Sequence, residues 1–202
     1  MTYPVALVLR GKRCVVVGGG RVAARKVEGL LAAGAEVVVV APEVGEEIRA
    51  QRVALVERPY RRGDLDGAWL ALAATDDPEV NASVHADAEE ARVWANTADA
   101  PGACSFTLPA VVRRGPVVVA VSTSGRSPAL ARWIRGEVAA LLGPEVAELA
   151  EWLAEARDEL KAAGRPTEDV DWRKTLDWDM LALIRTGRTA QARERLQACL
   201  SS

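Results

Sequence analysis

A short run of glycines near the start of the chain has the spacing of a phosphate-binding turn. Gly18, Gly20 and Ala23 fit the pattern G-x-G-x-x-G/A, directly after an apolar, β-branched run at residues 13–17. The first glycine permits a tight turn, the second lets a ligand approach the backbone, and the small third residue lets a helix lie close to the strand. The pattern therefore predicts a helix N-terminus whose free N–H groups face the pyrophosphate of a dinucleotide.

The residues after this turn favour NAD over NADP as the dinucleotide. A second valine run at residues 37–40 follows Gly34, and Glu43 lies just beyond it, where an acidic residue meets the ribose hydroxyls of NAD. No arginine directly follows that run to pair with a 2′-phosphate. Two alternatives stay open. The glycines can form an ordinary turn of an α/β protein, and Glu43 can be a solvated residue at a helix start after Pro42.

Carboxylates that follow later apolar runs are candidates for acid–base chemistry. Thr75, Asp76 and Asp77 end one run, and Asp99 lies shortly after another. Ligands and reacting groups gather at the carboxyl ends of parallel strands. A structural alternative exists for each group, because Asp76 or Asp77 can cap a helix that starts at Pro78, and Asp-Ala-Pro suits a turn at Asp99. From the residues alone, the turn is the simpler interpretation of Asp99.

A polar loop of small residues at positions 122–127 precedes Pro128. The loop can be a plain connection from a strand to a helix. It can also bind an anion, because hydroxyl groups and the N–H groups of a helix N-terminus suit carboxylates. The candidate contact residues are Ser122, Thr123, Ser124, Gly125 and Arg126. Four nearby arginines could assist, or could simply be solvated: Arg113, Arg114, Arg132 and Arg135.

The composition argues against several other kinds of site. The chain of 202 residues has a formal net charge of −2, so no basic field points to nucleic acid. It has one histidine, His85, and the cysteines at 14, 104 and 199 show no zinc-ligand spacing, which leaves acid–base work to carboxylates. Cys14 lies in an apolar run and is expected to fill the core. Without a membrane-spanning run or a signal-peptide pattern, we expect a cytoplasmic protein with no nucleic-acid or membrane partner.

The elements that would position these residues alternate between strand and helix in the first half of the chain. Strands are predicted where β-branched residues run together, and helices where apolar residues recur at helical spacing. The predicted strands are residues 13–17, 36–41, 53–57, 69–74 and 92–96, and the predicted helices are 21–33, 44–50 and 78–91. This order is typical of an α/β, Rossmann-like domain with a parallel sheet.

The second half of the chain has a different pattern, with two strand-like runs and then only helices. The runs are residues 104–112 and 117–122, with a hairpin turn between them at 113–116. The predicted helices are residues 128–142, 146–163, 171–186 and 189–200. Trp152, Trp172 and Trp178 are expected to pack the last helices together. The fold class is therefore a Rossmann-like sheet domain followed by a small linking segment and an all-α C-terminal part.

Four separated motifs carry a resemblance to a known family. They read GGGRVAARK at 18–26, AATDD at 73–77, NTADAP at 96–101 and VSTSGRSPALA at 121–131. In this order and spacing they resemble the precorrin-2 dehydrogenase family of sirohaem biosynthesis, which includes the N-terminal part of sirohaem synthases and bifunctional dehydrogenase/ferrochelatases. The resemblance is close through about residue 140 and weaker in the helical tail.

The resemblance implies oxidation of precorrin-2 to sirohydrochlorin, with NAD as hydride acceptor. It implies that Asp99 is the catalytic carboxylate and that the loop at 122–126 binds the carboxylates of the tetrapyrrole, with Thr123 where some relatives have serine. Together with the glycine turn it gives the candidate cofactor residues Gly18, Gly20, Arg21, Val22, Pro42, Glu43 and Thr75. Some members then insert Fe²⁺. The sequence leaves open whether this chain takes Fe²⁺ or Co²⁺ as a chelation substrate, and it shows no dedicated metal site.

The resemblance also implies a homodimer held together by a central segment and the helical tail. The predicted domains are an NAD-binding Rossmann domain at 1–112, a central dimerisation segment at 113–143 and a helical C-terminal domain at 144–202. A second hypothesis stays open, in which the chain is a non-catalytic dimer that senses a nucleotide or a tetrapyrrole. Saturable NAD binding without oxidation of the macrocycle would favour that hypothesis.

Overall fold

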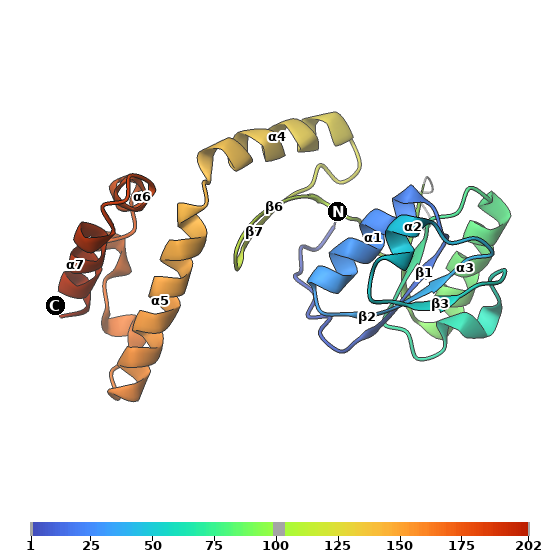
Figure 1. Cartoon of the computed structure of the whole chain (residues 1–202), viewed down its shortest axis with the longest axis horizontal. Helices are drawn as coiled ribbons and strands as arrows, with labels where there is room; N and C mark the ends of the chain where they lie inside the picture. The colour runs from blue at the N-terminus through green and yellow to red at the C-terminus, as the bar shows by residue number, and fades with distance from the viewer. Residues whose placement is uncertain (1, 99–103, 202) are drawn as a thin grey trace. The chain divides into compact units, whose positions relative to one another are not determined.

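The computed structural model describes residues 2–98 and 104–201. The chain divides into two compact units, Met1–Leu108 and Pro109–Ser202 (Figure 1). Asp99, the predicted catalytic carboxylate, lies outside the described residues.

A parallel sheet forms the centre of the first unit, with its strands in the order β3-β2-β1-β4-β5. The strands are β1 (Arg13–Val17), β2 (Glu36–Val40), β3 (Ala54–Val56), β4 (Leu70–Ala73) and β5 (Trp94–Thr97). β1 and β4 lie in the middle and are apolar on both faces, as expected of strands covered on both sides. The predicted Rossmann-like α/β fold is confirmed, with strand boundaries within about two residues of those expected from the sequence.

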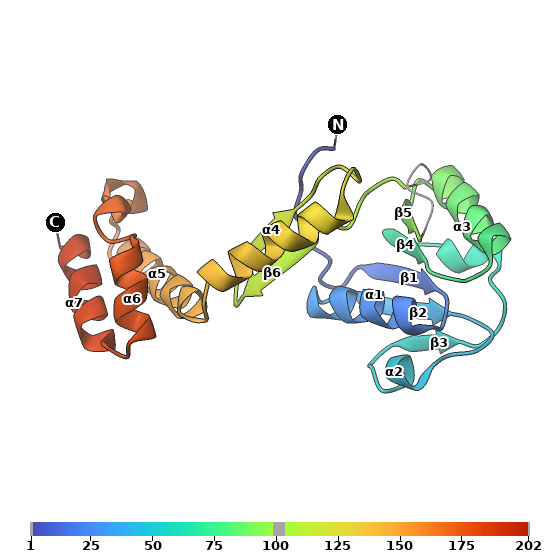
Figure 2. The same cartoon turned by 90° about the horizontal axis from the view of Figure 1, so that it is seen from above.

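Helices cover both faces of this sheet. They are α1 (Arg21–Ala32), α2 (Glu46–Arg49) and α3 (Pro78–Ala91). α1 and α2 pack on one face with Cys14 and Val16, whereas α3 packs on the other face with Val15 and Val17 (Figures 1 and 2). Burial raises the pKa of the Cys14 thiol to about 11, so this cysteine is an inert core residue, as expected.

The segment that leaves the first unit corrects one prediction, because the expected strand at 104–112 begins only at Ala110. Residues 104–106 instead run beside β5 through isolated contacts. The Ser105 N–H donates to the Ala95 carbonyl over 2.8 Å, and the Asn96 amide donates to the Phe106 carbonyl over 3.0 Å. Pro109 has no N–H to donate to a ladder, so regular pairing starts after it.

The second unit begins with a two-stranded antiparallel hairpin and a helix beside it. The elements are β6 (Ala110–Arg114), β7 (Val117–Val121) and α4 (Pro128–Leu141). Arg114 ties the hairpin to the end of α4, since its guanidinium donates to the carbonyls of Leu142 (2.6 Å) and Ala139 (2.9 Å). Arg114 thus caps a helix C-terminus and is committed to the fold.

Three further helices share their own apolar core in the second unit. They are α5 (Glu145–Ala162), α6 (Trp178–Arg185) and α7 (Thr189–Leu200). Trp152 is buried in this core and Trp172 packs against it, whereas the prediction was wrong for Trp178, which is 57 % exposed at the start of α6. No helix among the described residues is long and apolar enough to cross a bilayer.

The single helix predicted at 171–186 is also wrong. The chain forms a 3₁₀ turn at Trp172–Lys174 and then breaks before α6. Asp177 causes the break, because its carboxylate accepts a hydrogen bond from the Met180 N–H (2.9 Å) and so starts a new helix. The Asp177 side chain also pairs with Arg195 of α7, which adds a tertiary reason for the restart.

An ion pair between a buried carboxylate and a half-exposed guanidinium joins the start of α5 to the end of α6. Glu145 is 3 % exposed, and its Oε1 accepts a hydrogen bond from the Arg185 Nε over 2.9 Å. Hydrogen bonding to Arg185 holds the pKa of Glu145 below its ordinary value. The native state therefore favours the ionised carboxylate, and the pair stabilises the fold above the unfolded-state pKa.

Replacing Glu145 by glutamine is expected to lower the free energy of unfolding by about 1–2 kcal/mol at neutral pH, since Arg185 is itself half-exposed. The difference from the wild type should shrink as the pH falls through the native pKa of Glu145, because protonation removes the same charge. Urea unfolding at neutral and acidic pH measures both quantities. A difference that stayed constant into acid would show that the charge is not the cause.

Candidate functional site

The predicted cofactor residues of the first unit lie together at the carboxyl edge of the sheet. They follow three neighbouring strands, β2, β1 and β4, in that spatial order. The glycine turn and the start of α1 follow β1, Pro42 and Glu43 follow β2, and Thr75 follows β4. This is the edge at which parallel sheets bind ligands.

The glycine turn packs closely between the segments that follow β4 and β2. Gly18 has a φ of +126°, and a Cβ there would lie 2.4 Å from the Ala74 carbonyl oxygen. A Cβ at Gly19 would lie 1.8 Å from the Glu43 carbonyl oxygen, and the Gly19 carbonyl accepts a hydrogen bond from the Gly45 N–H over 3.0 Å. Side chains cannot be accommodated at either glycine, because the backbone of the segments after β4 and β2 packs directly against the turn.

Gly20 differs from both of these glycines, because nothing lies within 4 Å of the position its Cβ would take. It is the N-cap residue of α1 and has no side chain to cap the helix. The first turn of α1 also contains no acidic residue. Arg21 and Val22 follow it and are exposed. The open space, the uncapped N–H groups and the positive end of the helix dipole make this the natural place for a phosphate group.

The loop after β2 offers an exposed carboxylate beside this space. Pro42 and Glu43 are both exposed, while the backbone of Glu43 touches Gly19. Within the described parts of the chain the Glu43 carboxylate has no ion-pair partner. Glu46 and Glu47 start α2 nearby in sequence, so the local charge is negative and unfavourable for a 2′-phosphate.

Thr75 is held by a residue that the sequence did not single out. Asn81 of α3 accepts hydrogen bonds from the Thr75 N–H (3.3 Å) and hydroxyl (2.9 Å), and it donates to the Thr75 carbonyl over 2.9 Å. The Thr75 hydroxyl also accepts a hydrogen bond from the Asp77 N–H over 3.2 Å. Asp77 caps α3 through the N–H of Glu79 (2.8 Å), as one of the two sequence interpretations of this loop expected.

A second network ties down the chain on both sides of the residues around Asp99. Lys26 of α1 donates to the Asn96 side-chain oxygen over 3.0 Å, although the motif containing Lys26 gave it no role. The Thr97 N–H donates to the sulfur of Cys104 over 3.3 Å. Together with the Ser105–Ala95 hydrogen bond, the contact between Thr97 and Cys104 holds residues 104 and 105 beside β5.

The candidate substrate loop belongs to the second unit and forms a compact turn. Ser124 (φ +53°) and Gly125 (φ +78°) both have positive φ, and the Arg126 N–H donates to the Thr123 carbonyl over 3.1 Å, as in a type I′ turn. The N–H of Ser124 donates to the Ser122 hydroxyl (3.2 Å).

The same loop uses its other polar groups to start α4. The Ser127 N–H donates to the Thr123 hydroxyl (3.0 Å), and the Ser127 hydroxyl caps α4 at Leu130. Several N–H groups that an anion cradle would need are thus already used. Recognition of a carboxylate would therefore fall mainly to side chains, above all to the exposed guanidinium of Arg126.

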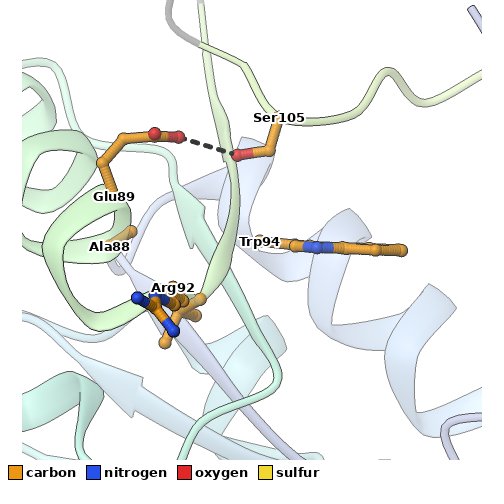
Figure 3. A pocket seen from close by; sticks show the side chains of 6 residues that line it. Ala88, Glu89, Arg92, Trp94 and Ser105 are labelled. Atoms are coloured by element: carbon orange, nitrogen blue, oxygen red, sulfur yellow. Dashed lines mark hydrogen bonds between the residues drawn. The ribbon is translucent and has the colours of Figure 1, made fainter.

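Two surface hollows lie on the opposite, amino edge of the sheet. One, of about 290 Å³, is lined by Ala88, Glu89, Arg92, Val93, Trp94 and Ser105 (Figure 3). Figure 3 shows the Ser105 hydroxyl bonded to Glu89 (3.3 Å) across its rim, with Trp94 pointing away. The second hollow borders the first residues of β1, β2 and β3. The residues that line these two hollows do not include the glycine turn. Among the described residues, no group of three His, Cys, Asp or Glu side chains is placed to hold a metal ion.

Comparisons with known proteins relate the chain to an NAD(P)-binding family and to proteins of sirohaem biosynthesis. A family described as "Putative NAD(P)-binding" matches residues 5–110, and one described as "Sirohaem biosynthesis protein central" matches residues 114–141. Siroheme synthase 1 of Serratia proteamaculans is 38% identical over 202 residues, which cover 96% of this chain and 42% of the relative. Siroheme synthase of Chromobacterium violaceum is 40% identical over 204 residues, covering 96% and 43%.

A solved structure matches over the full length of both chains. It is titled SirC, precorrin-2 dehydrogenase, with a TM-score of 0.73 and 27% sequence identity, and the match covers 100% of each chain. By contrast, the chain spans less than half the length of the curated relatives it matches.

Proposed function

The chain belongs to the NAD(P)-binding family that sirohaem synthases share with precorrin-2 dehydrogenases, and on this premise we propose that it oxidises precorrin-2 to sirohydrochlorin with NAD as the electron acceptor. The observation that carries the proposal is the glycine turn, which is closed by neighbouring backbone at Gly18 and Gly19 and open at Gly20. In the reaction, the macrocycle loses one hydride and one proton. The fold therefore has to hold a dinucleotide, a polycarboxylate and a base.

The residues at the carboxyl edge fit NAD. Gly20 leaves room for the pyrophosphate, the first N–H groups of α1 donate to it, and Arg21 and Val22 border it. Glu43 accepts hydrogen bonds from the adenosine ribose hydroxyls, with Pro42 shaping that side of the site. When bound, NAD supplies the acceptor for the hydride.

Substituting Glu43 by alanine is expected to raise the dissociation constant for NAD about 10- to 100-fold, because hydrogen bonds to a charged group are lost. The preference for NAD over NADP should narrow, since a negative charge near the 2′-position is removed. Isothermal titration with both coenzymes measures this. Glu47→Ala, which removes an exposed carboxylate from the nearby helix α2, is the matched control and should leave both affinities unchanged. Equal effects of the two variants would contradict a specific role for Glu43.

Asp99 is the proposed base that accepts the proton released when the hydride leaves. Its support is its match to the family motif and its place three residues after Asn96, near the end of β5. A carboxylate is a suitable base for this step. Side chains of the loop at 122–126, above all Arg126, hold carboxylates of the substrate.

We further propose that the active form is a homodimer, with the central segment 113–143 and the helices of 144–202 at the interface. The support is the apolar surface that this part of the chain exposes. Trp133 (63 % exposed) and Leu141 (55 % exposed) lie on α4, and Val118 (49 % exposed) lies on β7.

The test of the proposed function is anaerobic incubation of the protein with precorrin-2 and NAD. Formation of NADH supports a dehydrogenase. Saturable binding of NAD without NADH formation supports the alternative of a nucleotide- or tetrapyrrole-sensing dimer. Separate incubations of sirohydrochlorin with Fe²⁺ and with Co²⁺ decide whether the chain also inserts a metal, since formation of sirohaem from Fe²⁺, or of the cobalt complex from Co²⁺, is read directly from the absorption spectrum.

A further inference from the structure

We propose that Asn81 is a positioning residue for the coenzyme, because its side chain holds the end of β4 against the glycine turn. The inference rests on the proposed function in one respect, because two of its tests measure the binding of NAD. Neither the glycine fingerprint nor the aspartates of the β4 loop include this residue.

The Asn81 amide pairs with the backbone of a single residue, as a neighbouring strand would. It is 8 % exposed, its oxygen accepts a hydrogen bond from the Thr75 N–H (3.3 Å), and its nitrogen donates to the Thr75 carbonyl (2.9 Å). Its oxygen also lies 2.9 Å from the Thr75 hydroxyl, which shares its one proton between this oxygen and the Asp77 carbonyl, also at 2.9 Å. Both backbone groups of Thr75 are thus satisfied just beyond the last residue pairs of β4.

A short path of contacts connects Thr75 to the glycine turn. The next residue back, Ala74, donates its N–H to the Val17 carbonyl over 2.8 Å. The Ala74 carbonyl oxygen is the atom that leaves no room for a Cβ at Gly18. Because protein interiors are close-packed, a shift of Thr75 moves Ala74, and Ala74 then moves or releases the turn that receives the pyrophosphate.

The helix that carries Asn81 does not need this side chain for its own formation. Asp77 already caps α3 by accepting hydrogen bonds from the N–H groups of Glu79 (2.8 Å) and Val80 (3.2 Å). The hydrogen bonds of the Asn81 side chain go to Thr75 instead. Its role is therefore to fix the loop, and a buried amide at this position is explained by that role.

The first test compares two variants of the same helix. Asn81→Leu keeps the branched shape and the number of side-chain heavy atoms but loses every hydrogen bond to Thr75, and we expect the dissociation constant for NAD to rise about tenfold. Val84→Ala removes core volume from α3, where Val84 is fully buried, and should lower the unfolding midpoint without changing NAD affinity in the folded protein. An equal loss of NAD affinity in both variants would mean that Asn81 acts only through general stability and would overturn the inference.

The second test uses Asn81→Asp, in which one proton decides the interaction. A protonated carboxyl can donate to the Thr75 carbonyl as the amide does, whereas an ionised carboxylate places an oxygen against that carbonyl. We expect the NAD affinity of this variant to recover as the pH falls through the pKa of the new carboxyl, beyond any change seen in the wild type. A pH profile parallel to that of the wild type would count against positioning by Asn81.

Hydrogen exchange at the Thr75 amide tests the coupling without coenzyme. Faster exchange in Asn81→Leu than in Val84→Ala is the expected result, and equal protection in the two variants would overturn the inference. Hydrogen exchange separates the role of Asn81 in fixing the loop from the proposed function. If the Thr75 amide loses protection but the wild type forms no NADH with precorrin-2, the proposed function fails while the role of Asn81 in fixing the loop holds.

Discussion

Exchange of Asp99 for asparagine is expected to lower the rate of NADH formation from precorrin-2 by about 10²–10⁴-fold, the usual contribution of a positioned base. Asparagine keeps the shape of the side chain and cannot accept the proton. Since the coenzyme residues follow β1, β2 and β4, the dissociation constant for NAD should stay within about twofold of the wild type. Stopped-flow absorbance and isothermal titration measure the two quantities on the same protein.

Two other aspartates serve as controls for Asp99. Asp66→Asn changes an exposed carboxylate in the loop before β4, at the amino edge of the sheet, and should leave the rate unchanged. Asp76→Asn changes an exposed carboxylate at the carboxyl edge and tests the alternative that Asp76 is the base. A full rate in Asp99→Asn, or a larger loss in Asp76→Asn, would remove Asp99 from the reaction.

Alanine substitutions at two neighbouring glycines are expected to have different effects: Gly19→Ala should lower stability, whereas Gly20→Ala should lower the affinity for NAD. At Gly19 the new Cβ would lie 1.8 Å from the Glu43 carbonyl oxygen, so the loop after β2 must move and the free energy of unfolding should fall by about 3 kcal/mol. At Gly20 the Cβ meets nothing within 4 Å, and its φ of −88° is ordinary for alanine. Stability should therefore change by less than about 1 kcal/mol there.

Gly20→Ala should instead weaken NAD binding by at least about tenfold, because the methyl group takes the space through which the pyrophosphate reaches the N–H groups of α1. Thermal unfolding with and without NAD measures stability and binding together. Coenzyme affinity equal to that of the wild type in Gly20→Ala would mean that the dinucleotide does not lie over this turn. A stable, fully binding Gly19→Ala would contradict the packing of the Glu43 loop.

The parts of the fold that the sequence predicts well are those set by local pattern. The apolar runs give the strands of the first unit, and Pro78 with the aspartates before it gives the start of α3 to the residue. The break before α6 was missed because Asp177 is both a helix cap and a partner of Arg195, some eighteen residues away. Similarly, the late start of β6 depends on contacts that residues 104–106 make with β5.

The candidate site shows the same difference between residues that a local pattern predicts and residues that depend on contacts between distant parts of the chain. The fingerprint predicts the roles of Gly18 and Gly20, but Gly19 occupies a variable position of the pattern and is required only because the Glu43 loop approaches it in space. One feature of the sequence could have identified Asn81. It is a polar residue at helical spacing from Val84 and Ala88, which are both buried. That spacing places an amide on the buried face of α3, where it needs a partner, although the sequence does not identify Thr75 as that partner.

The most direct measurement of the central claim is a balance of products. Wild-type protein is incubated anaerobically with precorrin-2 and excess NAD, and NADH and sirohydrochlorin are quantified in the same sample. We expect equal amounts of NADH and sirohydrochlorin, both dependent on the protein and both strongly reduced in Gly20→Ala and Asp99→Asn. Sirohydrochlorin formed without NADH, or saturable NAD binding with neither product, would contradict the proposed function.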